Sequence, residues 1–188
     1  MRLMLAHAAL ALFVVVRVYD TVGVPADTAA AARTTASKIL KQANIDVRWV
    51  ECPGAKPAEP VELMVRLSAS TPASEPASLG FSYVDVQKQA GTLATVFADR
   101  VHVLAEAARA DEGELLGRAM AHEIGHLLLG THDHAVTGLM RGKWTSIELE
   151  KNRPVDWMLT RGDGASMRRA LNRRILGARD ASLIAAAR

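Results

Sequence analysis

The hydrophobic and polar positions of the chain follow two different periods. Residues 45–50 and 61–67 alternate between apolar and polar side chains, which predicts two β-strands. Three further short stretches, at residues 13–19, 79–84 and 92–97, are rich in β-branched or aromatic side chains and also predict strands. Apolar positions recur at helical spacing across residues 26–44, 99–110 and 111–129. The order strand, helix, four strands and two helices predicts an α+β domain with one mixed, twisted sheet and helices packed on it.

Polar residues mark the expected starts of the later helices. Asp99 and Asp111 are predicted N-caps, and Glu114, three residues after Asp111, completes the spacing of a capping box. Further along, we expect a short helix capped by Ser146 and a longer helix over about residues 165–176. The end of the chain therefore predicts a small helical part.

The composition is that of a globular protein, with 49% hydrophobic and 23% charged residues. A chain of 188 residues suits one domain with a substantial core. Basic residues outnumber acidic ones by 23 to 20, and the surplus lies among the C-terminal arginines. Because no aromatic side chains are interleaved with these arginines, we expect a solvated helix face and no nucleic-acid partner. The single cysteine, Cys52, predicts no intrachain disulfide and an inert, partly buried thiol.

The first residues of the chain favour export. Arg2 precedes an apolar run that contains several alanines, which is typical of a secretory signal. We therefore expect a leader at residues 1–12 of a secreted or periplasmic protein, with a cytoplasmic protein as the alternative. The run is too short, and interrupted by His7, for a stable membrane span. Residues 13–144 then form the predicted main part of the domain, and residues 145–188 a helical extension of the same domain.

The residues that carry chemistry lie on the third predicted helix. His122, Glu123 and His126 match the pattern H-E-x-x-H. On a helix this spacing places two imidazoles one turn apart on the same face, with the carboxylate beside them. Two converging imidazole nitrogens suit Zn²⁺, and a nearby carboxylate suits a general base. Two more histidines, His132 and His134, follow shortly after the expected end of the helix.

Residues 122–144, HEIGHLLLGTHDHAVTGLMRGKW, resemble the zinc-binding signature of the metzincin metallopeptidases. The metzincin pattern is H-E-x-x-H-x-x-G-x-x-H followed by a methionine turn, and this chain departs from it because Gly130 comes one place late. The segment is more similar to a small bacterial group of metzincin-like proteins that have H-E-I-G-H-L-L-L-G, three residues, a histidine, Gly-Leu-Met and Trp. The resemblance implies a metzincin-like zincin domain with His134 as third ligand, a methionine turn at residues 138–140, and Trp144 behind it.

Three residues compete for the third ligand position. His132 lies ten residues after His122, the offset of the usual metzincin pattern, so spacing alone favours it. The delay of Gly130 lengthens the helix, and the returning chain then needs extra residues to reach the metal, which favours His134. Asp133 offers an oxygen ligand as a further alternative.

By this resemblance we expect a zinc-dependent endopeptidase that acts as a monomer on peptide or protein substrates. The three ligands of Zn²⁺ would be His122, His126 and His134. Glu123 would be the catalytic base, and Met140 would provide an apolar floor beneath the metal. The strand at residues 79–84 would pair with an extended substrate, as the upper edge strand of metzincins does.

Other functions use the same motif. In a thermolysin-like site a downstream glutamate, Glu148 or Glu150, would be the third ligand, which leaves the histidine pair and the Gly-Leu-Met segment unexplained. A hydrolase of non-peptide amides would use the same residues. The alternative without catalysis is a zinc-stabilised binding module, and Glu123 argues against it because a closed structural site has no use for a free base.

Overall fold

The computed structural model describes residues 12–51, 61–71 and 78–186. Cys52, His7 and residues 1–11 of the predicted leader lie outside this part of the chain, and what we expect of them stays a prediction. The secondary-structure elements are, in chain order, β1 (Leu12–Asp20), α1 (Ala26–Gln42), β2 (Ile45–Glu51), β3 (Glu62–Ser68), β4 (Gly80–Asp85), β5 (Ala90–Phe97), α2 (Ala98–Ala108), α3 (Glu112–Leu129), α4 (Ser146–Lys151), the 3₁₀ helix η1 (Pro154–Trp157) and α5 (Arg161–Ala186).

The strands form one five-stranded sheet in the order β2-β1-β3-β5-β4. The first four strands in this order are parallel to one another, and β4 runs antiparallel to β5 at the edge of the sheet. The prediction of an α+β fold with one mixed sheet is confirmed. Because β4 is paired on one side only, its other side is an unpaired strand edge among the described residues.

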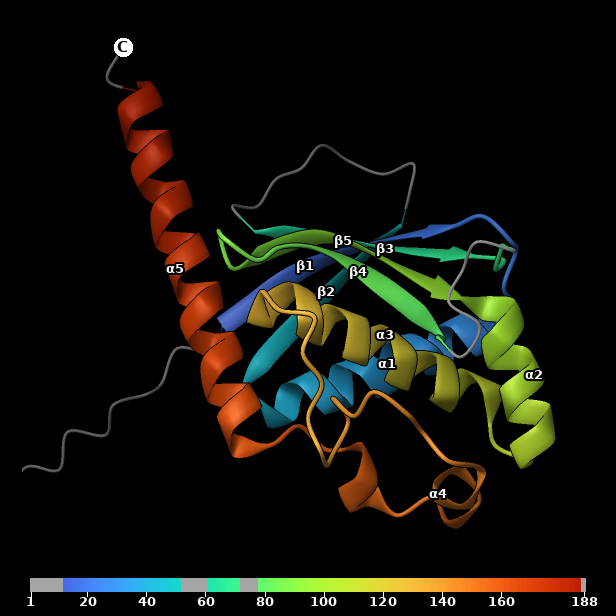
Figure 1. Cartoon of the computed structure of the whole chain (residues 1–188). Coiled ribbons are helices and arrows are strands. Elements are labelled where there is room, and N and C mark those ends of the chain that lie inside the picture. The colour runs from blue at the N-terminus through green and yellow to red at the C-terminus, as the bar shows by residue number, and fades with distance from the viewer. Residues whose placement is uncertain (1–11, 52–60, 72–77, 187–188) are drawn as a thin grey trace, which may run out of the picture.

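Two helices cover one face of this sheet. α1 and α3 lie side by side beneath it, with α2 near one end of α3 and α5 near the other (Figure 1). Alternate strand residues such as Val14, Val16, Leu63 and Val65 point into this layer and are fully buried. Each large aliphatic side chain buried in this way stabilises the fold by roughly 1.5–3 kcal/mol. The alternate apolar residues of the strands therefore form the core between the sheet and the helices.

Helix α3 is buried on nearly all sides. Fifteen of its 18 residues are buried, because the sheet, α1, α2 and α5 all contact it. Its first turn is capped as predicted, with the Asp111 carboxylate accepting the N–H of Glu114 at 2.6 Å. The Glu114 side chain does not close the capping box, because it pairs with Arg118 and Asn152 instead. Gly130 ends the helix in the left-handed conformation, at φ 71°.

Two predicted caps are wrong by one or two residues. α2 begins at Ala98, and Asp99 lies inside its first turn, where its carboxylate accepts the N–H and the hydroxyl of Ser70. This carboxylate is thus occupied by the loop after β3 and not by its own helix. α4 is capped by Thr145, which forms a complete capping box with Glu148, so Ser146 is the first helical residue.

Helix α5 is much longer than the predicted helix over residues 165–176. It starts at Arg161, where Thr160 and Asp163 exchange side-chain to backbone hydrogen bonds, and it continues to Ala186. Its second half extends past the edge of the sheet and away from the body of the protein (Figure 1). No helix in the described part of the chain is long and apolar enough to cross a membrane.

The Arg174 side chain anchors α5 to the rest of the domain. Its guanidinium donates to the backbone carbonyls of Leu127 near the end of α3 and of Gly91 in β5, the latter at 3.0 Å. Burial lowers the pKa of Arg174, and the neighbouring Arg173 adds to this effect. A cation near the C-terminal end of α3 also interacts favourably with the helix dipole.

Replacing Arg174 by alanine should therefore loosen the contact between α5 and α3. We expect the free energy of unfolding, measured in urea, to fall by about 1–3 kcal/mol, the usual cost of losing hydrogen bonds from a charged group. The exposed Arg173→Ala is the matched control and should change it by less than about 0.5 kcal/mol. Equal effects of both substitutions would show that the two carbonyl contacts do not hold α5.

Candidate metal centre

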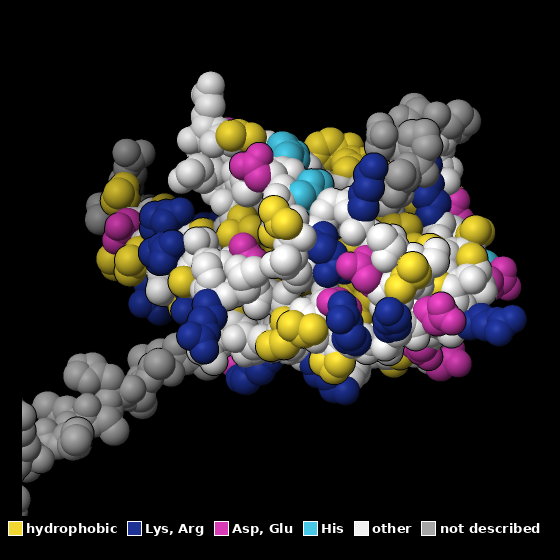
Figure 2. Space-filling model, turned by 60° about the horizontal axis from the view of Figure 1, so that its bottom comes forward, with side chains coloured by type: hydrophobic (Ala, Val, Ile, Leu, Met, Phe, Trp, Pro, Cys, Tyr) yellow, Lys and Arg dark blue, Asp and Glu magenta, His cyan; other side chains and the backbone are white. Residues whose placement is uncertain are grey.

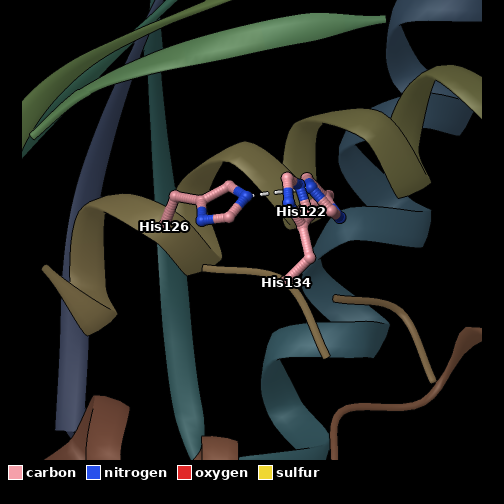
Figure 3. A group of neighbouring side chains, drawn as sticks. All are labelled: His122, His126 and His134. Atoms are coloured by element: carbon pink, nitrogen blue, oxygen red, sulfur yellow. Dashed lines mark hydrogen bonds between the residues drawn. The ribbon is translucent and has the colours of Figure 1, made fainter. Parts of the chain in front are cut away.

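Three histidines from two parts of the chain converge on one point. His122 and His126 project from α3, and His134 reaches them from the loop that follows it (Figure 3). One nitrogen of each ring lies within 4.8 Å of the others. The first two rings are buried and the third is exposed, so the group lies at the floor of an open depression.

Backbone carbonyls orient the two buried rings. Nδ1 of His122 lies 2.9 Å from the carbonyl oxygen of Leu139, and Nδ1 of His126 lies 2.9 Å from that of Thr131. A carbonyl only accepts hydrogen bonds, so both Nδ1 atoms carry the proton and both Nε2 atoms present a lone pair. These Nε2 atoms are 3.0 Å apart, where two lone pairs repel each other unless a cation or a proton lies between them. Two nitrogens bound tetrahedrally to one Zn²⁺ would be roughly 3.3 Å apart, so the pair fits such an ion.

The protonation equilibria of the site match this arrangement. Burial lowers the pKa of His122 to about 3, and the adjacent His126 adds to this effect. Burial likewise lowers the pKa of His126 to about 4. Both imidazoles are therefore neutral at neutral pH, which is the form that binds metal ions. Burial raises the pKa of Glu123 to about 7, so this carboxyl can accept and release a proton near neutral pH.

A methionine supports α3 between the two buried histidines. Met140 is 1% exposed and packs against the helix at Gly125, where a Cβ would lie 2.6 Å from the methionine sulfur. A larger residue at position 125 would require the Met140 side chain to shift. The N–H of Ala135 donates to the carbonyl of Met140 at 2.8 Å, which ties the residue after His134 to the same support. Residues 134–140 thus form a closed loop whose two ends both lie at the histidine group.

Aromatic and cationic side chains pack behind the site. The indole of Trp144 meets the ring of His122 edge-on at 5.8 Å and the ring of Trp157 at 5.3 Å. The guanidiniums of Arg118 and Arg141 lie 4.1 and 5.4 Å from the centre of the Trp157 ring. Cation–π contacts of this kind contribute roughly 0.5–2 kcal/mol each. The stack therefore reaches the ring of His122 through Trp144.

Glu123 points toward the edge strand of the sheet. Its carboxylate is buried and accepts a hydrogen bond of 2.7 Å from the hydroxyl of Ser82 in β4. The sequence prediction did not single out Ser82. The alternation in β4 indicates that Ser82 faces the core, but no motif connects it to a residue 41 positions later.

The structure separates the three candidates for the third ligand position. His134 belongs to the histidine group, whereas His132 and Asp133 are exposed and lie outside it. His132 lines the same depression as His134, but its ring lies outside the group. The geometry therefore favours His134, as the resemblance implies, over the simple spacing rule, which favours His132.

A cleft of about 750 Å³ opens beside the histidines. Val103, Leu104 and Ala107 of α2 form one wall of it, and Trp144 forms part of the opposite wall. The face of the molecule seen in Figure 2 carries histidine side chains bordered by hydrophobic and basic ones. A large apolar side chain of a ligand fits these walls.

A second depression of about 570 Å³ continues from the first along the edge strand. Ser82 and His132 line both, so the two depressions meet at these two residues, beside the histidine group. Tyr83 and Lys88 belong to the second depression, at the far end of β4 and in the turn after it. An extended ligand can therefore continue on both sides of the site.

Comparison with solved structures identifies the class of fold. A zinc-dependent peptidase from Methanocorpusculum labreanum (strain Z) superimposes with a TM-score of 0.56 at 16% sequence identity, covering 81% of this chain and 99% of the other. A second similar structure, archaemetzincin from Methanopyrus kandleri, has a TM-score of 0.53 at 14% identity and covers 89% of this chain and 99% of its own. No family model and no curated protein sequence matches the chain. The chain thus has the fold of metzincin-type zinc peptidases, and the predicted fold is confirmed.

Alanine substitutions should separate the two exposed histidines. We expect His134→Ala to weaken zinc affinity by more than about 100-fold, because even the loss of a partner outside the ligand shell costs 10- to 100-fold. His132→Ala should keep the zinc content and affinity of the wild-type protein, since its ring lies outside the group. Elemental analysis and competition with a chromophoric chelator measure both quantities. The reverse pattern would assign the ligand to His132.

Proposed function

We propose that the protein is a zinc-dependent endopeptidase. The observation that carries the proposal is the convergence of three imidazoles, two of them neutral with fixed tautomers, beside the buried carboxylate of Glu123. The fold shared with zinc-dependent peptidases supports the same conclusion. The residues that would hold the metal are His122, His126 and His134.

Zinc bound by these residues would supply a Lewis acid that lowers the pKa of water and polarises a peptide carbonyl. Glu123 would accept the proton from the attacking water. It would hold this proton and deliver it to the leaving amine, and a pKa near neutrality suits both transfers. The carbonyls of Leu139 and Thr131 would keep the buried imidazoles oriented throughout.

Cleavage inside a chain, and not at its end, is supported by the shape of the surface. The first depression contains the histidine group, the second continues along β4 and the turn after it, and the two share Ser82 and His132. The unpaired edge of β4 runs along them and offers backbone N–H and C=O groups to an extended peptide. The substrate we propose is therefore an extended peptide segment that adds a strand to β4.

The larger depression would select an apolar side chain next to the scissile bond. Its walls at Val103, Leu104, Ala107 and Trp144 offer apolar area of the size of a leucine or phenylalanine side chain. Arg100 and Lys143 lie at the same cleft and would favour peptides without further positive charges.

The geometry gives less support to a glutamate as third ligand. Glu148 belongs to the capping box of α4 and pairs with Arg141 at 3.3 Å, and Glu150 is exposed on the same helix. Neither joins the histidine group among the described residues. A binding module without catalysis would not need Glu123, and burying its carboxylate costs free energy. A catalytic role gives a reason for this cost.

Replacing Glu123 by glutamine tests the proposal. The variant keeps the size of the side chain but loses the proton acceptor, so we expect kcat to fall by roughly 10²- to 10⁴-fold while zinc is retained. The assay uses fluorogenic peptides blocked at both ends, which only an endopeptidase cleaves. Glu150→Gln is the matched control and should keep wild-type activity. A wild-type protein that binds zinc but leaves all blocked peptides intact would contradict the proposal.

A charge in the cleft tests the expected side-chain preference. Val103 is 64% exposed, so Val103→Lys should fold normally, yet it adds a cation to the apolar wall. We expect kcat/KM to fall by about tenfold or more for peptides with leucine or phenylalanine at the preferred position, because lost apolar contact is worth roughly 1–3 kcal/mol. Val155→Lys changes a similarly exposed residue outside the cleft and should leave kcat/KM for the same peptides unchanged. If kcat/KM for these peptides were also unchanged in Val103→Lys, the preference for apolar side chains would belong to another surface.

A further inference from the structure

One hydroxyl group contacts Glu123 at two places. Oγ of Ser82 lies 2.7 Å from Oε2 of Glu123 and 2.9 Å from its backbone carbonyl oxygen. Ser82 is 6% exposed, so water does not compete for this contact. The hydroxyl carries a single proton that these two acceptors of one residue share, so the contact ties the carboxylate to the helix that carries it.

Gly80, the neighbouring inward-facing residue of β4, also contacts the Glu123 side chain. A Cβ on Gly80 would lie 3.0 Å from Oε1 and 3.1 Å from Cγ of Glu123, and 2.5 Å from the carbonyl oxygen of Thr95. Glu123 therefore packs directly on the backbone of the edge strand, where no larger side chain fits. Gly80 and Ser82 are two residues apart and face the same side of the sheet.

The two oxygens of the carboxylate have different surroundings. Oε2 is held by Ser82, which is the only hydrogen-bond donor to this carboxylate in the described part of the chain. Oε1 lies against the bare backbone at Gly80, beside the cleft that both residues line. Charge-assisted hydrogen bonds are short and directional, so Oε2 is the fixed oxygen, whereas no hydrogen bond holds Oε1 among the described residues.

We propose that Ser82 is a positioning residue of the peptidase, which holds Glu123 through Oε2 and presents Oε1 to the reacting groups. The inference rests on the proposed function. It adds a role for β4: the strand whose outer edge would bind the substrate backbone also orients the catalytic base with its inward side chains. The same strand would then align the substrate and the catalytic base, so a displacement of β4 would disturb both.

The kinetic test compares Ser82→Ala and Ser82→Thr with the wild-type enzyme. Loss of the hydroxyl should lower kcat by roughly tenfold to a hundredfold, because a hydrogen bond to a charged group is lost at the base itself. KM should change by less than about threefold, because Ser82 is only 6% exposed and offers a substrate little contact, and zinc content should stay the same, since no histidine is altered. Ser82→Thr keeps a hydroxyl and should restore most of the rate.

A double mutant separates positioning from a general structural effect. If Ser82 acts through Glu123, Ser82→Ala should reduce the residual rate of Glu123→Gln by much less than it reduces the wild-type rate. The proposal would be overturned if Ser82→Ala lowered the rate of the wild-type enzyme and of Glu123→Gln by the same factor. A wild-type kcat in Ser82→Ala would overturn it as well. Ser37→Ala is the matched control, because it also removes one partly buried hydrogen bond, which Nε1 of Trp49 in β2 donates to Oγ of Ser37 in α1 at 2.8 Å. Neither of these residues lines the two depressions.

A measurement without turnover keeps the inference testable if the peptidase function itself is wrong. In crystals of zinc-loaded Ser82→Ala we expect the Glu123 side chain in more than one rotamer, and in one rotamer in the wild-type protein and Ser82→Thr. An unchanged single rotamer in Ser82→Ala would show that packing on Gly80 alone fixes the side chain. Absence of peptide cleavage by the wild-type protein would instead count against the proposed function.

Discussion

Two backbone carbonyls determine the tautomer and the orientation of the two buried histidines at the candidate metal centre. The oxygens of Leu139 and Thr131 take the Nδ1 protons of the buried histidines and so direct both Nε2 lone pairs to the same point. Each carbonyl lies outside α3, one in the loop of residues 134–140 and one just after the helix end. The orientation of the histidine rings therefore depends on the loop as much as on the helix, and Met140 packs this loop against α3 at Gly125.

The burial of α3 explains how a polar site is maintained in a small domain. A helix that is buried on nearly all sides is stabilised by packing and needs few solvent contacts. His122, Glu123 and His126 lie on the one stretch that faces a cleft, and each has a specific polar partner. This arrangement removes water from the base and the imidazoles, which is the cause of all three pKa shifts.

Much of this could be predicted from the sequence, for identifiable reasons. The strands and α3 follow from periodicity, which local residues determine, and the H-E-x-x-H spacing places two imidazoles on one face in any straight helix. The predicted caps at Asp99 and Ser146 are wrong, because the Asp99 carboxylate binds Ser70 in a distant loop and Thr145 caps α4 in place of its neighbour. The outer half of α5 packs on little, so no apolar pattern marked its length. Ser82 could not be found because its role depends on β4 crossing over α3, a contact between distant parts of the chain.

The third histidine differs from the other two in one respect. His134 is exposed, and no hydrogen bond holds its second ring nitrogen within the described residues, whereas both buried rings are anchored. If the three rings bind a metal ion, two ligands are thus oriented before the ion arrives, and only the third lies at the solvent. The detachment of this single exposed ring would then set the rate of metal exchange, so the ion would enter and leave from the solvent side without opening the core.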